Sequence, residues 1–136
     1  MIKSKIKDLE KLININFKKT ELLQQALTHK SFNNIDNNEK LEFLGDRVLG
    51  LVISQTLLNK YPSEKEGIID KKYANLVNKK TCSLIAKKLN LSKFILLGSS
   101  HKKLDRSSDK INSDCLEALI GAIYLDNGFK FAERFI

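Results

Sequence analysis

Two pairs of acidic residues stand at the start of two long apolar segments. Glu42 and Asp46 are four residues apart, and positions 48–59 behind them carry no charged residue. Asp114 and Glu117 are three apart and open a second apolar run, in which positions 112–128 carry no Lys or Arg. Residues three or four apart lie on the same face of a helix. Because like charges on one face repel, we expect a cation to compensate each pair.

The chemistry that suits two such pairs is the binding of a hard divalent cation. Mg²⁺ and Mn²⁺ prefer carboxylate and water oxygens to His or Cys. In so small a chain we expect the two apolar helices to pack together, with Gly121 allowing a close approach. Four carboxylates would leave much of each coordination sphere to water and substrate phosphate. That arrangement is typical of metal-assisted phosphodiester hydrolysis.

From the residue types and their spacing alone, the acid pairs could also have a purely structural role. A single Glu/Asp pair at helical spacing is commonly a solvated face or a capping feature. Asp114 could also interact with the helix dipole if its helix begins there. The joint occurrence of two pairs, each leading into an apolar helix, favours a metal site without excluding that alternative.

The segments that contain these acids resemble the motifs of the ribonuclease III family. Residues 38–46, Asn-Glu-Lys-Leu-Glu-Phe-Leu-Gly-Asp, resemble its signature. Residues 26–31, Ala-Leu-Thr-His-Lys-Ser, resemble a second segment, and residues 114–126, which begin Asp-Cys-Leu-Glu-Ala-Leu, resemble another. Glu66-Gly67 with Asn75-Leu76-Val77 resembles a further motif between them. The resemblance implies an all-α, ribonuclease III-like nuclease domain over residues 1–136, with no double-stranded-RNA-binding domain in this chain.

The resemblance also implies roles for the four acids. Glu42, Asp46, Asp114 and Glu117 would be metal ligands, with Asp46 and Glu117 the catalytic ones. Mg²⁺ would be the cofactor and Mn²⁺ a substitute, and no small-molecule cofactor is expected. The implied activity is hydrolysis of double-stranded RNA to 5′-phosphate and 3′-hydroxyl ends, as in the maturation of rRNA precursors.

Other residues receive roles at the edge of the site and between subunits. Phe43 matches an aromatic residue that inserts into the partner subunit of family homodimers, and an ordinary core Phe is the alternative. Glu39 and Glu66 match outer acids at the site margin and the dimer contact. His29 and His101 have no acid or nucleophile arranged around them, so we expect the first to be structural and the second solvated.

The net charge of +8 and an isoelectric point near 9.5 favour a polyanionic partner. For any single pair of basic residues, the alternative to RNA binding is an ordinary solvated helix face. The basic residues expected to form an RNA-binding rim around the acids are Lys71, Lys72, Lys102, Lys103, Arg106 and Lys110.

Helical periodicity extends along the chain, and no period-2 alternation stands out. We expect helices over residues 5–13, 20–27 capped by Thr20, 39–60 ended by Pro62, and 81–89. Ser63 and Glu66 predict a capping box for a further helix to about residue 78. Residues 99–110 form the longest polar segment, and we expect a surface loop there. We expect Gly128 to be the C-cap of the helix before it.

Targeting signals are not visible in the sequence. The first twelve residues are charged throughout, and no run approaches the roughly 18 apolar residues of a membrane span. We therefore expect a cytoplasmic protein with no membrane partner. Cys82 and Cys115 are too far apart in the sequence for a metal knuckle. We expect both to be small buried residues of the core.

Three functions other than a nuclease remain as alternatives for this sequence. A catalytically inactive relative would bind RNA without cutting it, which the complete acid set argues against. A helical, Mg²⁺-dependent nucleotide pyrophosphatase would fit Glu39 and Glu42 three apart, but not the residues around them. A plain basic RNA-binding module would not explain acids on apolar helix faces.

Overall fold

The computed structural model describes residues 2–99 and 107–136, which form helices joined by turns and loops with no β-strand among them. The only backbone pairing of the sheet type in this part of the chain is an isolated parallel bridge between Thr28 and Leu96. The predicted all-α class is confirmed. The elements in chain order are α1 (Ile2–Ile13), α2 (Thr20–Ala26), α3 (Glu39–Lys60), α4 (Glu66–Val77), α5 (Lys79–Lys88), the 3-10 turn η1 (Leu91–Lys93), α7 (Asp109–Asn127) and α8 (Phe129–Phe135).

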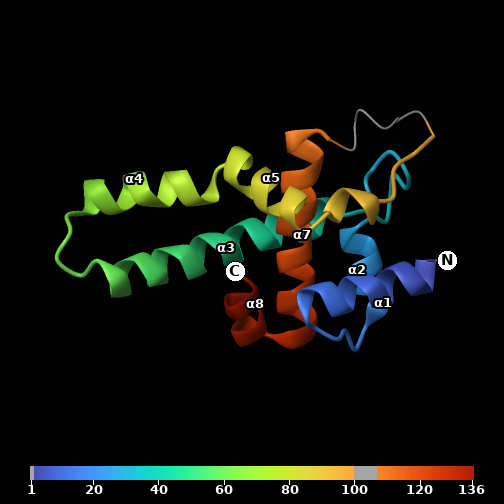
Figure 1. Ribbon diagram of the computed structural model, residues 1–136, viewed down its shortest axis with the longest axis horizontal. Coiled ribbons are helices and arrows are strands. Elements are labelled where there is room, and N and C mark those ends of the chain that lie inside the picture. The colour runs from blue at the N-terminus through green and yellow to red at the C-terminus, as the bar shows by residue number, and fades with distance from the viewer. Residues whose placement is uncertain (1, 100–106) are drawn as a thin grey trace.

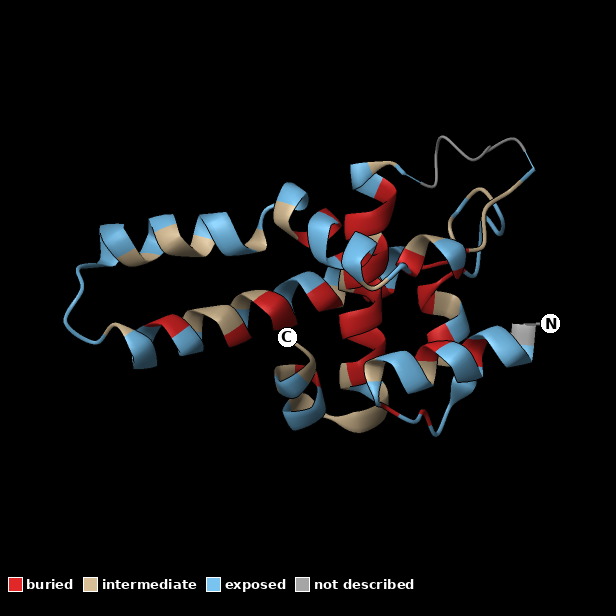
Figure 2. Cartoon of the chain, viewed as in Figure 1, coloured by how far each residue is buried: buried red, intermediate tan, exposed pale blue. Residues whose placement is uncertain are grey.

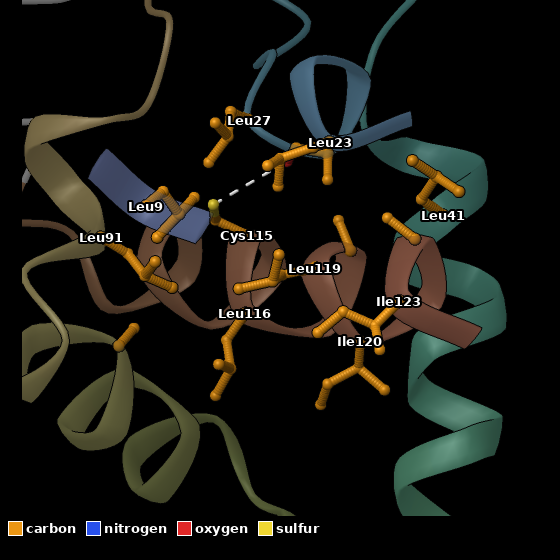
Figure 3. Close-up of a cluster of buried hydrophobic side chains, with 14 of the residues drawn as sticks. Leu9, Leu23, Leu27, Leu41, Leu91, Cys115, Leu116, Leu119, Ile120 and Ile123 are labelled. Atoms are coloured by element: carbon orange, nitrogen blue, oxygen red, sulfur yellow. Dashed lines mark hydrogen bonds between the residues drawn. The ribbon is translucent and has the colours of Figure 1, made fainter. Parts of the chain in front are cut away.

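Helix α7 is the centre of the hydrophobic core, and α1, α2, α3, α5 and α8 surround it (Figure 1). Its apolar residues face several neighbours at once. Leu119 packs among side chains of other helices, such as Leu9 and Leu23, and all three are fully buried (Figure 3). Apolar burial of this kind contributes most of the stabilising free energy of a small domain.

Both cysteines are free and buried, as the sequence predicts. Cys115 lies in the core, where its Sγ is 3.8 Å from the carbonyl oxygen of Ala26 (Figure 3). Burial raises the pKa of Cys115 to about 12 and, with the charges of Glu117 and Asp46, the pKa of Cys82 to about 11. Neither thiol is therefore ionised near neutral pH.

The second half of α3 runs outward beside α4, and the two helices form an arm that projects from the core (Figure 1). Helix α3 has 22 residues, a length of about 33 Å at 1.5 Å per residue. In α4, all of whose residues the structure describes, none is buried (Figure 2). The arm leaves large apolar side chains exposed, namely Leu51, Leu58, Ile68 and Leu76.

Two helix starts differ from the prediction. Helix α2 has Lys19, not Thr20, at its N-cap, and the carboxylate of Asp126 accepts the backbone N–H groups of Lys18 and Lys19 at 2.8 Å each. Helix α4 has Lys65 at its N-cap with Glu66 as its first residue, so the predicted capping box is wrong.

Helix α7 begins earlier than the acid motif indicates. The side-chain oxygen of Ser108 accepts the N–H of Ile111 at 3.4 Å, and the helix starts at Asp109. Asp114 therefore lies in the second turn, which weakens the predicted interaction with the helix dipole. The helix ends at Gly128 with φ of 91°, as predicted for a C-cap. Among the described residues, no helix is long and apolar enough to cross a membrane.

Candidate metal centre

Helices α3 and α7 cross at two glycines that have no room for a side chain. A Cβ at Gly45 would clash with the carbonyl oxygen of Glu117, and a Cβ at Gly121 would clash with the carbonyl oxygen of Leu41. Each glycine therefore meets the backbone of the other helix, as the sequence predicts for Gly121. The contact fixes the first two turns of α3 against the middle of α7, where the acids of both helices lie.

Three of the four predicted acids converge at this crossing. Glu42 on α3 and Asp114 and Glu117 on α7 each offer a carboxylate oxygen, and these oxygens lie within 4.8 Å of one another. All three residues are partly buried. Asp46 borders Glu117 but lies outside this group, and its side chain is 58% exposed.

Burial and the charges of neighbouring acids raise the pKa values of Glu42 and Glu117. Desolvation and the neighbouring Asp46 carboxylate raise the pKa of Glu117 to about 8. Desolvation and the charge of Asp114 raise the pKa of Glu42 to about 7. Half-buried carboxylates that repel each other gain most from a bound cation. The all-oxygen donor set fits Mg²⁺ or Mn²⁺, with the remaining coordination positions left to water or substrate.

A lysine partly compensates these charges. The Lys110 ammonium donates to Asp114 Oδ2 at 2.8 Å across one helical turn. Hydrogen bonding to Asp114 and the charges of Glu42 and Glu39 raise the pKa of Lys110. Lys110 was expected in the RNA-binding rim, and its only ion pair among the described residues is with an acid of the cluster.

A small cavity of about 60 Å³ opens beside the acids. Glu39 lines its margin, as the motif resemblance implies. His29 lines it too, and this position beside the acids was not predicted, whereas its hydrogen bonds with Ser31 fit the expected structural role. The Nδ1 atom of His29 accepts the Ser31 N–H at 3.1 Å, and Ser31 Oγ accepts the Gly98 N–H at 2.9 Å. The other lining residues are Lys30, Asn38, Glu42, Lys110, Ile111 and Asp114.

The remaining predicted residues lie away from the acids or outside the described residues. Glu66 is on the arm, where it lines a groove with Ser54 and Asp70. Lys71 and Lys72 are on α4, and the Lys72 ammonium lies 4.3 Å from the centre of the Tyr61 ring. The residues of the predicted rim and loop that lie outside the described part of the chain are His101, Lys102, Lys103 and Arg106.

Phe43 is a surface residue beside the acids. It is 60% exposed, so the alternative of an ordinary core Phe is wrong. The Arg47 guanidinium lies 3.6 Å from the centre of the Phe43 ring and donates to the Phe43 carbonyl at 3.0 Å. Arg47 also lies 3.6 Å from Asp46. An exposed ring held in place by its neighbour is suited to a contact with another molecule.

Sequence comparisons identify relatives of this chain. A family model described as ribonuclease-III-like matches residues 19–136. Ribonuclease 3 of Pelagibacter ubique is 59% identical over 128 residues, which are 94% of this chain and 58% of that protein. Ribonuclease 3 of Campylobacter jejuni is 46% identical over 129 residues, again 94% of this chain and 58% of the relative.

Two solved structures extend the comparison to the fold. The first is the nuclease domain of ribonuclease III from Campylobacter jejuni, in work on structural flexibility in a region involved in dimer formation. It superposes with a TM-score of 0.93 at 46% identity, over 96% of this chain and 92% of that one. Dicer from Pichia stipitis superposes with a TM-score of 0.65 at 26% identity, over 88% and 51%. The motifs, the glycine crossing with its acids and these matches together place the chain in the ribonuclease-III-like family.

Proposed function

We propose that this chain is the nuclease domain of a metal-dependent endoribonuclease that hydrolyses phosphodiester bonds of double-stranded RNA. The observation that carries the proposal is the convergence of Glu42, Asp114 and Glu117 at the crossing of α3 and α7. The chain spans 58% of the length of each of the two curated relatives named above, and their names support the proposal.

The proposal gives the acids complementary tasks. Glu42, Asp114 and Glu117 would hold Mg²⁺, or Mn²⁺ in its place, and Asp46 would add a carboxylate on the solvent side of Glu117. A bound divalent ion would supply an activated water and stabilise the leaving 3′-oxygen, which yields 5′-phosphate and 3′-hydroxyl ends. Glu39, at the cavity margin, would interact with the ligand shell through water.

A homodimer is part of the proposal. Each chain offers one acid cluster, and cutting both strands of a duplex needs two clusters related by a two-fold axis. The exposed Phe43 ring beside the cluster is the proposed anchor, and Glu66 on the arm is a proposed contact. A relative whose nuclease domain has a region involved in dimer formation supports this arrangement.

The proposed substrate follows from charge and shape. A net charge of +8 suits RNA, and duplex RNA is recognised mainly through its A-form shape, phosphates and 2′-hydroxyls. Lys71 and Lys72 on the arm remain proposed phosphate contacts, as do Lys102, Lys103 and Arg106. Maturation of rRNA precursors is the proposed cellular role, as the resemblance of the motifs to the ribonuclease III family implies.

The test is cleavage of end-labelled RNA with Mg²⁺ present or replaced by EDTA. We expect nicks in a long RNA duplex, but none in single-stranded RNA or duplex DNA, and no release of pyrophosphate from nucleoside triphosphates. Raising the salt from 50 to 200 mM should reduce duplex binding sharply. Duplex binding without Mg²⁺-dependent cleavage would favour an inactive RNA-binding relative, and pyrophosphate release would favour a nucleotide pyrophosphatase.

A further inference from the structure

Lys110 is placed where its charge acts on the acid cluster. It lies one helical turn before Asp114, and its ammonium is 2.8 Å from Asp114 Oδ2. It lines the same small cavity as Glu39 and Glu42. The Lys110 side chain is 66% exposed, whereas that of Asp114 is 19% exposed. A mobile cation thus reaches from solvent to a mostly buried carboxylate.

A second Lys–Asp pair, whose Asp is also on α7, provides a comparison. Lys87 on α5 is 3.0 Å from Asp109 on α7, and Ser83 donates to the same Asp109 oxygen at 2.8 Å. This pair joins two helices, and neither residue lines the cavity beside the acids. The Lys110–Asp114 pair lies within one helix, so it does not connect separate elements, and its effect is exerted on the neighbouring acids.

We propose that Lys110 is a tethered counterion of the acid cluster, which occupies Asp114 while no divalent cation is bound and releases it when one binds. The inference rests on the proposed metal site. Its physical basis is that a Lys–Asp hydrogen bond and a metal–Asp bond use the same carboxylate oxygens. An ammonium within a few ångströms also repels a divalent cation directly.

The counterion has two opposite effects. Without metal, Lys110 reduces the repulsion among Glu42, Asp114 and Glu117 and so stabilises the folded chain. When a divalent cation arrives, the Asp114 hydrogen bond must break and the ammonium must move into solvent, which its exposed stem permits. Lys110 therefore lowers the affinity of the cluster for metal while it keeps the metal-free cluster assembled.

The test is Mn²⁺ binding to the whole chain, measured by electron paramagnetic resonance of the free ion at constant pH and ionic strength. We expect Lys110→Gln to bind Mn²⁺ about five- to tenfold more tightly, because one unit charge is removed a few ångströms from the ion. Lys110→Arg keeps the charge and should bind like the parent. Lys87→Gln is the matched control, since it removes an equal charge from an ion pair outside the cluster.

Thermal unfolding gives a readout that does not depend on activity. In EDTA, Lys110→Gln should unfold at a lower temperature than the parent, and saturating Mn²⁺ should raise its unfolding temperature by more than it raises the parent's. The proposed counterion role of Lys110 is overturned if Lys110→Gln and the parent bind Mn²⁺ within about twofold of each other. It is also overturned if Lys110→Arg changes the Mn²⁺ affinity as much as Lys110→Gln does. If the parent takes up no Mn²⁺, the metal site of the proposed function falls as well.

Discussion

Gly45 on α3 lies against the backbone carbonyl of Glu117 on α7, so closely that a methyl group at Gly45 has no space. The residue that allows the helices to touch is therefore adjacent to an acid of the cluster. Stability and the proposed metal binding depend on the same contact, and a change at Gly45 should affect both.

Replacement of Gly45 by Ala should destabilise the protein and separate the acids. The added methyl forces the backbones apart, which costs about 1–3 kcal/mol of unfolding free energy. Urea denaturation followed by circular dichroism measures this loss. Because the acids then lie farther apart, Mn²⁺ affinity should fall in the folded variant.

Gly67→Ala is the matched control for Gly45→Ala. Gly67 is also in a helix, and a Cβ there would have no atom within 4 Å. Ala favours a helix over Gly by roughly 0.5–1 kcal/mol, so stability should be unchanged or slightly higher. Equal losses from both substitutions would show that the α3–α7 contact has no special role.

Glu117→Gln should abolish cleavage while leaving the fold and RNA binding intact. Gln keeps the shape and helix propensity of Glu but removes the negative charge that would hold the metal. We expect at least about a hundredfold slower cleavage of duplex RNA, since even outer-shell changes at metal sites cost 10–100-fold. Glu64→Gln, an exposed position between α3 and α4, should cut at the parent's rate.

Metal-free protein should become less stable as the pH rises. The pKa values of Glu42 and Glu117 in the folded chain are about 7 and about 8, against 4.5 for the ordinary carboxyl. Between about pH 5 and 8 the folded chain therefore holds more protons than the unfolded one, so the free energy of unfolding falls with pH. Urea denaturation in EDTA at several pH values across this window measures the slope.

The same titration has an internal control. Glu117→Gln removes one of the two groups, so its stability should depend less on pH than the parent's. Saturating Mn²⁺ should also flatten the parent's profile, because the metal replaces the protons. A parent whose stability in EDTA rises from about pH 5 to 8 would contradict the assigned direction of both shifts.

Phe43→Ala should weaken self-association without lowering the stability of the monomer. The ring is 60% exposed in the single chain, so its removal leaves no cavity there, whereas loss of an apolar anchor costs interface energy. Sedimentation velocity over a range of concentrations measures the monomer–dimer balance. Phe32→Ala, which changes another ring that is 53% exposed, should leave the balance unchanged.

Local patterns in the sequence predicted the elements that carry the acids. The uncharged run after Asp46 and the stop before Pro62 predicted α3 with its observed limits, Glu39–Lys60. Gly121 predicted a close helix crossing, which the structure confirms. Both predictions rest on short-range effects, namely helical periodicity, the backbone restriction before proline and the absence of a side chain.

Features that depend on distant contacts were not predictable. Asp126, more than a hundred residues away, accepts the backbone N–H groups of Lys18 and Lys19 just before α2, whereas sequence rules look for a local cap such as Thr20. The more exposed position of Asp46 follows from helix geometry, since four residues advance about 400° and rotate it some 40° from Glu42. The Lys110–Asp114 pair was missed because the start of α7 was placed too late.

The central position of α7 has a consequence for synthesis on the ribosome. Helix α3 is complete at Lys60, but the helix that covers its apolar face begins only at Asp109. At 5–20 residues per second, the 48 residues from 61 to 108 take roughly 2–10 s to translate. During that interval Val48 and Leu49 lack the surface of α7, and Glu42 lacks the two α7 acids with which it forms the cluster. The nascent chain therefore gains the centre of its core and its acid cluster in one late step.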